Sequence, residues 1–157
     1  MTNTRTNTRD WTWTPPPAMN RMMSTMLKLP VLHRMVSKSI LLITFTGRKS
    51  GKTFTTPVGY LWEGSTVTIL TKRFRKWWQN FVTPAPVTLR LQGRNVQGEA
   101  VAITDVDGIT PILAHMVEVH PREADIFEVR VENGKADLAS VRQAAERVVI
   151  IQVTLKS

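Results

Sequence analysis

Between residues 40 and 104 the chain is a succession of short apolar or β-branched runs separated by brief turns. The turns read "GRKSGK", "EGS" and "GRN", and each contains a glycine. Links this short join antiparallel neighbours, because a parallel crossover needs a dozen or more residues. The predicted strands cover residues 40–46, 53–62, 66–71, 87–92 and 96–104. A small antiparallel barrel or sheet is therefore the expected core of the fold.

Two details refine this expectation. Residues 87–92 alternate, with Val87, Leu89 and Leu91 on one face, so this strand has one buried and one exposed face. Pro57 interrupts the second run and predicts a strand edge or a bulge, since proline cannot donate to a ladder.

Helical patterns flank the strands. They cover residues 107–119 and 138–146, with a less regular stretch between them and a last strand over residues 147–155. Near the N-terminus, apolar residues recur at helical spacing and predict a helix over residues 18–37: Met19, Met22, Met23, Met26 and Leu27. The preceding residues 1–17 are rich in Thr, Asn, Arg and Pro, typical of a flexible tail. We predict an α+β protein with a single domain over residues 18–157.

Composition narrows the function. The 157 residues carry a formal net charge of +9 with a pI near 10.7, so anionic ligands are favoured. Zero cysteines exclude disulfides, thiol catalysis and cysteine-ligated metals. No apolar run approaches the roughly 18 residues that span a bilayer, and the N-terminus lacks the apolar core of a secretory signal. A cytoplasmic protein is expected.

The segment "LLITFTGRKSGKT", residues 41–53, resembles a phosphate-binding loop at first sight. A P-loop has four residues between its glycines and opens a helix. Here only three residues separate Gly47 from Gly51, and a strand-like run follows. The triphosphate interpretation therefore fails, leaving a solvated basic hairpin or another anion site.

A second basic cluster favours the anion site. It lies in "TKRFRKWW" and comprises Lys72, Arg73, Arg75 and Lys76. In a small antiparallel barrel this strand end can lie near the first turn. Cations from both segments, with hydroxyls and backbone N–H groups, would suit a polyanionic ligand.

These segments resemble a known family. "TFTGRKSGKTFTTPVGYLWEGSTVTILTK", then "WWQN" and "PVTLRLQGRNVQGEAVAITD", are similar to the deazaflavin-dependent nitroreductases, also called F-420 quinone reductases. The resemblance covers residues 41–105 and, more loosely, the remainder to the C-terminus. It implies a split β-barrel related to the flavin-reductase and pyridoxamine-phosphate-oxidase barrels.

The resemblance also implies site residues. Arg48 and Lys49 would hold the phosphate and oligoglutamate tail of coenzyme F-420, Pro57 would pack on its ring, and Asn80 would tie the helix that carries the site tryptophan. The residues expected to bind the coenzyme are Arg48, Lys49, Ser50, Gly51, Lys52, Pro57, Thr71, Lys72 and Trp77.

The chain departs from the family pattern in three places. The stretch after the hydroxyl–lysine pair is shortened to "RFRK", Phe54 stands where arginine is common, and Tyr60 is the single tyrosine. The shortened stretch implies a different wall for the tail groove. The scarcity of tyrosine argues against activation of nitroimidazoles.

The expected reaction is hydride transfer from the reduced deazaflavin to a flat apolar acceptor: a quinone, an enone or a nitroaromatic. Tyr60 and Thr71 are the candidate catalytic donors to the resulting oxyanion, with a core role as the alternative for Tyr60. An FMN-binding reductase and a non-catalytic cofactor- or anion-binding protein remain open alternatives. The protein is expected to be a monomer or a homodimer.

Three rival functions are less favoured. "KRFRKWW" interleaves cations and aromatics as single-strand binders do, but no recognised nucleic-acid motif is present, so nucleic-acid binding is not expected. His115 and His120 lie about 140° apart around a helix, unlike a zinc-chelating pair, so no metal is expected. The Met-rich helix fits core packing or peripheral contact with the inner face of the membrane.

Overall fold

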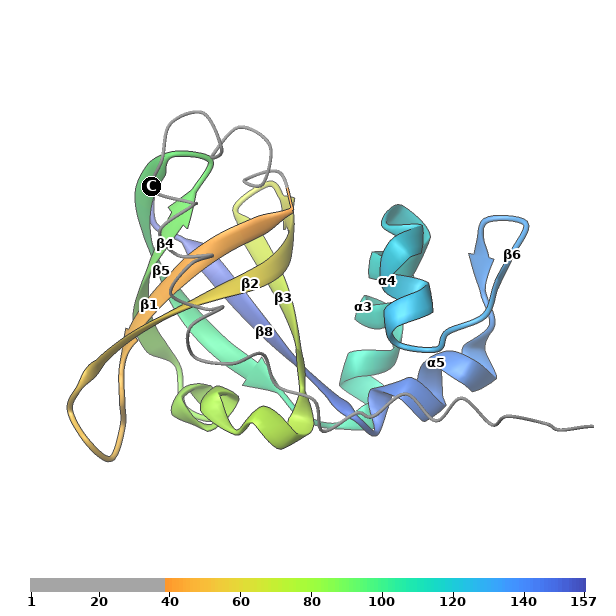
Figure 1. Cartoon of the computed structure of the whole chain (residues 1–157), viewed down its shortest axis with the longest axis horizontal. Coiled ribbons are helices and arrows are strands. Elements are labelled where there is room, and N and C mark those ends of the chain that lie inside the picture. The colour runs from red at the N-terminus through yellow and green to blue at the C-terminus, as the bar shows by residue number, and fades with distance from the viewer. Residues whose placement is uncertain (1–38) are drawn as a thin grey trace, which may run out of the picture.

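The computed structural model describes residues 39–157, so the predicted tail 1–17 and helix 18–37 lie outside the described residues. The order of elements follows the predicted series of strands and helices (Figure 1). The strands are β1 (Ile40–Thr46), β2 (Thr53–Glu63), β3 (Thr66–Lys72), β4 (Ala85–Leu91), β5 (Arg94–Ile103), β6 (Val131–Glu132), β7 (Lys135–Ala136) and β8 (Val148–Leu155). The helices are α3 (Val106–Val119), α4 (Pro121–Ile126) and α5 (Leu138–Ala145), with short 3₁₀ helices η1 (Arg73–Arg75) and η2 (Trp77–Phe81).

The main sheet is a closed antiparallel barrel in the order β1-β2-β3-β8-β5-β4. Three hairpins join β1 to β2, β2 to β3 and β4 to β5, as the turn sequences predict. The last strand, β8, enters between β3 and β5 and completes the barrel. The predicted α+β split barrel is confirmed.

Two cores share strand β8. Ile151 and Val153 face the barrel interior, whereas Val148 and Ile150 face a second core formed with α3, α4 and α5. This helical layer lies on one side of the barrel (Figure 1). Because both faces of β8 are covered, its apolar run is nearly continuous rather than alternating.

The pairing of β2 changes along its length. Residues 53–59 pair with β1, whereas residues 60–63 pair with β3. Beyond the pair Tyr60↔Ile69, the two strands diverge and β3 continues only with β8. Pro57, opposite Leu42 of β1, therefore lies on a local edge, as its missing N–H predicts. This divergence opens a gap in the barrel wall.

The region between α3 and α5 is more regular than the sequence indicates. Pro121 begins the short helix α4, because proline is suited to the first turn of a helix. A small β6–β7 hairpin follows, with Asn133 and Gly134 at positive φ in its turn. No helix within residues 39–157 is long and apolar enough to cross a membrane.

Candidate functional site

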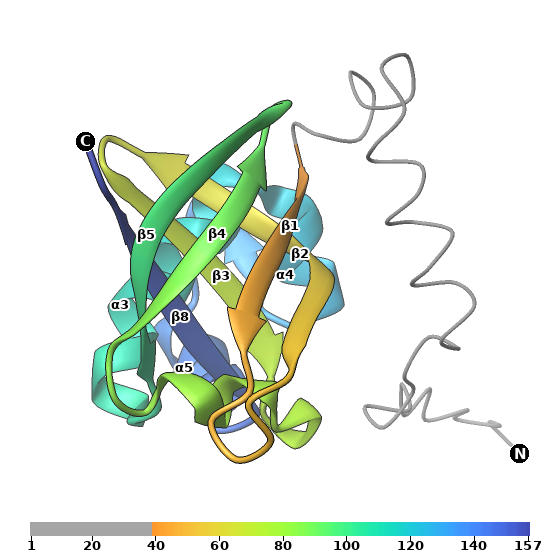
Figure 2. The ribbon, with the colours of Figure 1, turned by 90° about the vertical axis from the view of Figure 1, so that its left-hand side faces the viewer.

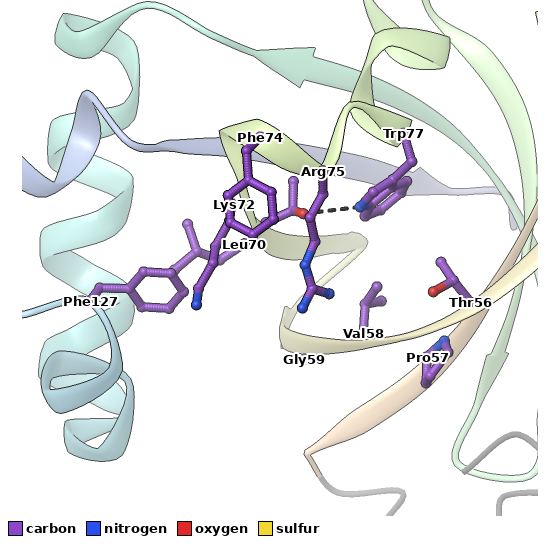
Figure 3. A pocket seen from close by; sticks show the side chains of 11 residues that line it. Thr56, Pro57, Val58, Gly59, Leu70, Lys72, Phe74, Arg75, Trp77 and Phe127 are labelled. Atoms are coloured by element: carbon purple, nitrogen blue, oxygen red, sulfur yellow. Dashed lines mark hydrogen bonds between the residues drawn. The ribbon is translucent and has the colours of Figure 1, made fainter. Parts of the chain in front are cut away.

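The gap between β2 and β3 holds a cavity of about 500 Å³, which we call the β2–β3 cavity. Its walls come from β2, from the end of β3, from η1 and η2, and from Phe127 after α4 (Figure 3). The lining residues are Thr56, Pro57, Val58, Gly59, Leu70, Thr71, Lys72, Phe74, Arg75, Trp77 and Phe127. Among the described residues, the facing edges of β2 and β3 have no strand partner here, so backbone groups also reach the cavity.

Trp77 forms a fixed wall. Its indole Nε1 donates a hydrogen bond to Thr71 Oγ1 at 3.0 Å (Figure 3). The ring stacks on Phe45 with centroids 5.8 Å apart and meets Phe81 edge-on at 5.9 Å. Because Phe81 is fully buried, these contacts hold the indole against the barrel interior.

Two cations line the cavity, Lys72 and Arg75. The Arg75 side chain extends between Lys72 and Val58 (Figure 3). Burial lowers the pKa of the Arg75 guanidinium, but an arginine in a protein remains charged at neutral pH. The site therefore presents a partly desolvated positive charge, which an anionic group of a ligand would stabilise.

Arg73 does not belong to this cluster, so the prediction that it contributes to the anion site is wrong. Its guanidinium donates to the backbone carbonyl oxygens of Thr104 at 2.6 Å, Val148 at 3.1 Å and Glu146 at 3.2 Å. These bonds tie η1 to the ends of β5, α5 and β8. Helix-end and strand-end carbonyls that need donors explain why this cation turns away from the cavity.

The basic hairpin lies at the same end of the barrel as η1 and η2 (Figure 2). Its turn is closed by bonds from Gly47 N to Lys52 O at 2.7 Å and from Gly51 N to Gly47 O at 2.9 Å. Gly51 has φ +68°, a conformation that glycine adopts without strain. Arg48, Lys49 and Lys52 are exposed and do not line the β2–β3 cavity.

Asn80 connects this hairpin to the cavity wall. Its Oδ1 accepts a hydrogen bond from the backbone N–H of Arg48 at 2.8 Å, and its Nδ2 donates to the Trp77 carbonyl oxygen at 2.8 Å. One side chain therefore fixes the distance between the basic turn and Trp77. The predicted tie by Asn80 is present, and the two basic segments do lie near each other.

Tyr60 is placed differently from the other predicted site residues. It is buried in the barrel core, where its hydroxyl accepts a 3.5 Å hydrogen bond from Gln92 Nε2. It does not line the β2–β3 cavity, although it contributes to a neighbouring cavity. Its burial and its bond with Gln92 favour the core role, which was the alternative to donation to an acceptor.

The structure thus groups Pro57, Thr71, Lys72 and Trp77 around one cavity, with the hairpin from Arg48 to Lys52 beside it. The sequence interpretation placed Arg75 in the basic cluster of the anion site but not among the coenzyme-binding residues, and it missed Phe74 and Phe127. Arg75 was recognisable from its charge. Phe127 gave no signal, because its position depends on how α4 packs against the barrel.

The two histidines of the described residues, His115 and His120, belong to no metal-binding arrangement. No group of three or more His, Asp, Glu or Cys residues that could hold a metal ion occurs among residues 39–157. His115 Nε2 instead lies 2.9 Å from Glu63 Oε1 at the surface. His115 therefore links α3 to the end of β2.

The fold and the cavity define a split-barrel protein with a cofactor-sized site at the separation of two strands. The chain belongs to the F420H(2)-dependent quinone reductase family, whose model matches residues 19–146. This membership confirms the predicted class, a deazaflavin-dependent oxidoreductase, and its coenzyme.

Solved structures share the fold at low sequence identity. A domain-swapped dimer matches with a TM-score of 0.51 and 17% identity, over 85% of this chain and 94% of the other. A putative general stress family protein from Xanthomonas campestris pv. campestris matches with a TM-score of 0.50 and 13% identity, over 92% and 87%. An F420 reductase matches with a TM-score of 0.41 and 13% identity, over 85% of this chain and 93% of the other. No curated protein matches the chain.

Proposed function

We propose that the protein transfers a hydride from reduced F-420 to a quinone, with the coenzyme's ring in the β2–β3 cavity and its anionic tail along the basic hairpin. The observation that carries this proposal is the bond between Arg48 N and Asn80 Oδ1, which holds the hairpin beside the wall that Trp77 forms. These two bonds support a ring site and a tail site held next to each other.

The cavity suits a flat heterocycle. Pro57, Val58 and Trp77 supply apolar and aromatic surface, and the edges of β2 and β3 supply backbone donors and acceptors for ring heteroatoms. Sites for flat cofactors combine such apolar walls with a few polar groups that fix orientation. When bound, the coenzyme supplies the hydride, and the chain holds and orients it.

The charges suit the tail. Lys72 and Arg75 lie where the phosphate would leave the cavity, and Arg48, Lys49 and Lys52 continue the positive surface on the hairpin. The backbone N–H of Ser50 would add a donor at the turn, whereas the N–H of Gly51 already bonds to Gly47 O. This supply of cations exceeds what a single phosphate needs, which favours F-420 with its several carboxylates over FMN.

Thr71 has a limited role in this proposal. Its Oγ1 accepts the Trp77 indole bond, so its own hydroxyl hydrogen is the group left to donate toward the cavity. Thr71 would help to orient the ring, with Trp77 as the wall behind it. Quinones are the favoured acceptors because of the family, with enones and nitroaromatics as finer alternatives.

The test is a titration of the purified full-length chain with F-420, followed by coenzyme fluorescence, with FMN as the comparison. We expect saturable binding of F-420 in the micromolar range, weaker binding of FMN, and reduction of menadione by the reduced complex. Absence of F-420 binding at tens of micromolar would overturn the proposal. Tight binding of FMN with no binding of F-420 would reassign the cavity to the flavin.

Two further expectations concern assembly and location. The protein is a monomer or a homodimer, and light scattering would distinguish the two by their mass. Peripheral membrane contact through residues 18–37 would be seen as flotation with anionic liposomes that a chain without those residues lacks. The cytoplasmic location stays a prediction.

A further inference from the structure

A second cavity, of about 650 Å³, lies beside the β2–β3 cavity, and we call it the α4 cavity. Its lining comes from the start of β1, the middle of β2 and the corner between α3 and α4. The lining residues are Ser39, Ile40, Gly59, Tyr60, Leu70, Met116, His120, Pro121, Arg122, Glu123 and Ile126. Gly59 and Leu70 line both cavities, so the two spaces meet at the divergence of β2 and β3.

Glu123 stands at this junction. Its Oε1 lies 3.8 Å from the position that a Cβ on Gly59 would occupy. Because Gly59 has no side chain, the carboxyl group faces the strand edge directly. Within the described lining of both cavities, Glu123 provides the one carboxyl group.

The surroundings of Glu123 favour its neutral form. Burial raises the pKa of its carboxyl group, and the charge of His120 lowers it by a smaller amount. Arg122 lines the same cavity, while Lys72 and Arg75 line the adjoining one, and the Tyr60 hydroxyl bonds to Gln92 in the barrel. No hydrogen bond joins the Glu123 carboxyl to another residue in the part of the chain that the structure describes. The group is therefore available to a bound molecule.

The rest of the α4 cavity suits an apolar acceptor. Ile40, Leu70, Met116 and Ile126 contribute aliphatic or thioether surface, and the volume lies within the range of roughly 300–1,000 Å³ of small-molecule sites. A molecule there would lie next to Gly59, across the strand edge from a ring in the β2–β3 cavity.

We propose that the α4 cavity holds the quinone and that Glu123 is the catalytic acid that protonates its oxygen. This inference rests on the proposed function, since it takes the coenzyme to occupy the β2–β3 cavity. It assigns the acid to a residue that neither the basic motifs nor the tyrosine pattern indicates.

Protonation by Glu123 would complete a two-electron reduction of the quinone. The bound coenzyme would supply a hydride, two electrons and one hydrogen nucleus, which forms the first O–H bond on one quinone oxygen and leaves the other oxygen as the anion. The O–H bond of Glu123 breaks, a new O–H bond forms on the acceptor oxygen, and the product is the quinol. Glu123 is left as a carboxylate and regains a proton from water at the His120 side. Oxidation of the reduced coenzyme releases one proton to water, so the solvent neither gains nor loses protons overall.

The experiment compares the wild type with Glu123→Gln, which removes the acid, and Glu123→Asp, which keeps it on a shorter side chain. Glu99→Gln is the matched control, because Glu99 is exposed on β5 and lines neither cavity. Four quantities are measured: F-420 affinity, menadione binding to the coenzyme-free protein by tryptophan fluorescence, single-turnover reduction of menadione against pH, and the ¹³C titration of labelled glutamates.

We expect Glu123→Gln to bind F-420 as the wild type does and to reduce menadione about 10²-fold more slowly, the lower end of general-acid contributions. The wild-type rate should fall as the pH rises through the pKa of Glu123, and this dependence should vanish in Glu123→Gln. Glu123→Asp should recover part of the rate, and Glu99→Gln should behave as the wild type. The ¹³C signal that Glu123→Gln lacks should titrate above the ordinary glutamate value of 4.5.

The failures are distinguishable. A wild type that does not bind F-420 overturns the proposed function. Normal F-420 binding with an unchanged rate and pH profile in Glu123→Gln overturns the inference alone. If Glu123→Gln does not fold, the Glu123 signal is identified by its loss in Glu123→Asp. A wild-type Glu123 signal that titrates at or below the ordinary glutamate pKa of 4.5 then overturns the inference by itself.

Discussion

The side-chain carbonyl of Asn80 accepts a hydrogen bond from the backbone N–H of Arg48 at 2.8 Å, across 32 positions of sequence. The other end of the same amide donates to the carbonyl oxygen of Trp77. An exposed hairpin would otherwise move independently of the barrel end. The bond therefore gives the basic turn a fixed position relative to the cavity, and a ligand that contacts both parts gains from this preorganisation.

Asn80→Ala should consequently weaken F-420 binding more than it weakens binding of a deazaflavin that lacks the phosphate and glutamate tail. Loss of about 1 kcal/mol of ordering corresponds to a roughly fivefold rise in the dissociation constant for F-420. Fluorescence titrations of both ligands measure the difference. Asn95→Ala, at an exposed position near the start of β5, is the control. An equal loss for the two ligands would contradict the assignment of the hairpin to the tail.

Arg75 and Lys76 are adjacent cations with different positions. Both are exposed, but Arg75 lines the β2–β3 cavity, whereas Lys76, which has a positive φ of 54°, does not line it. Arg75→Gln should raise the dissociation constant for F-420 about tenfold, since a charge-assisted hydrogen bond contributes roughly 1.5–3 kcal/mol. Lys76→Gln should change it less than twofold at 0.15 M salt. Equal effects would mean that net charge, rather than the cavity, sets the affinity.

Much of the fold follows from local sequence. Short glycine turns fixed the antiparallel hairpins, and the nearly continuous apolar residues of β8 reflect burial on both faces. The strand bounds from Ile40 to Glu63 differ from the predicted ones by a single residue at Glu63. The pattern of apolar residues does not predict that β8 pairs with β3 and β5, because this pairing joins residues far apart in the sequence.

The site was only partly predictable for the same reason. Pro57, Thr71 and Trp77, which line the cavity, were selected through the family resemblance, and the expected tie by Asn80 is present. Arg73 was wrongly grouped with its basic neighbours, because sequence shows a charge but not which carbonyl oxygens lie within its reach. Glu123 became notable only when the packing of α4 set it beside Gly59.

The position of Arg73 leads to a prediction about stability. Arg73→Met should lower the free energy of unfolding by about 2–4 kcal/mol, because three backbone carbonyls lose a charged donor. Urea unfolding followed by far-UV circular dichroism measures this change, with the exposed Arg94 replaced by Met as the control. F-420 affinity should be unchanged at temperatures where the variant is folded. A loss of F-420 affinity with unchanged stability would instead indicate that Arg73 belongs to the anion site.

Asp137 caps the N-terminus of α5, and its ionisation makes the free energy of unfolding depend on pH. The backbone N–H of Ser140 holds the pKa of Asp137 below its ordinary 3.8, with Arg130 contributing in the same direction. The folded state thus binds the proton less readily than the unfolded state, so this stabilisation is present above pH 3.8 and is lost as the pH falls through the lowered value. Asp137→Asn should therefore unfold at a lower urea concentration than the wild type at pH 7, and the difference should shrink as the pH falls below 3.8. A difference independent of pH would contradict a role for the carboxylate charge.

A substitution at Gly59, at the junction of the two cavities, can separate an effect on stability from an effect on the rate of menadione reduction. A Cβ there would meet Glu123 Oε1 and the Ser39 carbonyl oxygen at 3.8 Å, an ordinary contact, and β2 is extended at this point. Gly59→Ala should therefore fold with nearly wild-type stability, since alanine also restricts the unfolded chain. In the proposed arrangement, the added methyl group would nevertheless lie between the coenzyme and the acceptor. We expect a several-fold slower single-turnover reduction of menadione with little change in F-420 affinity, because a small displacement of reacting groups lowers the rate strongly.

Gly64→Ala tests the general cost of replacing a glycine, since Gly64 lies in the β2–β3 turn at φ +60° and lines neither cavity. That control should lose stability and keep its rate, and a Gly59→Ala variant with the wild-type rate would place the transfer away from this strand edge.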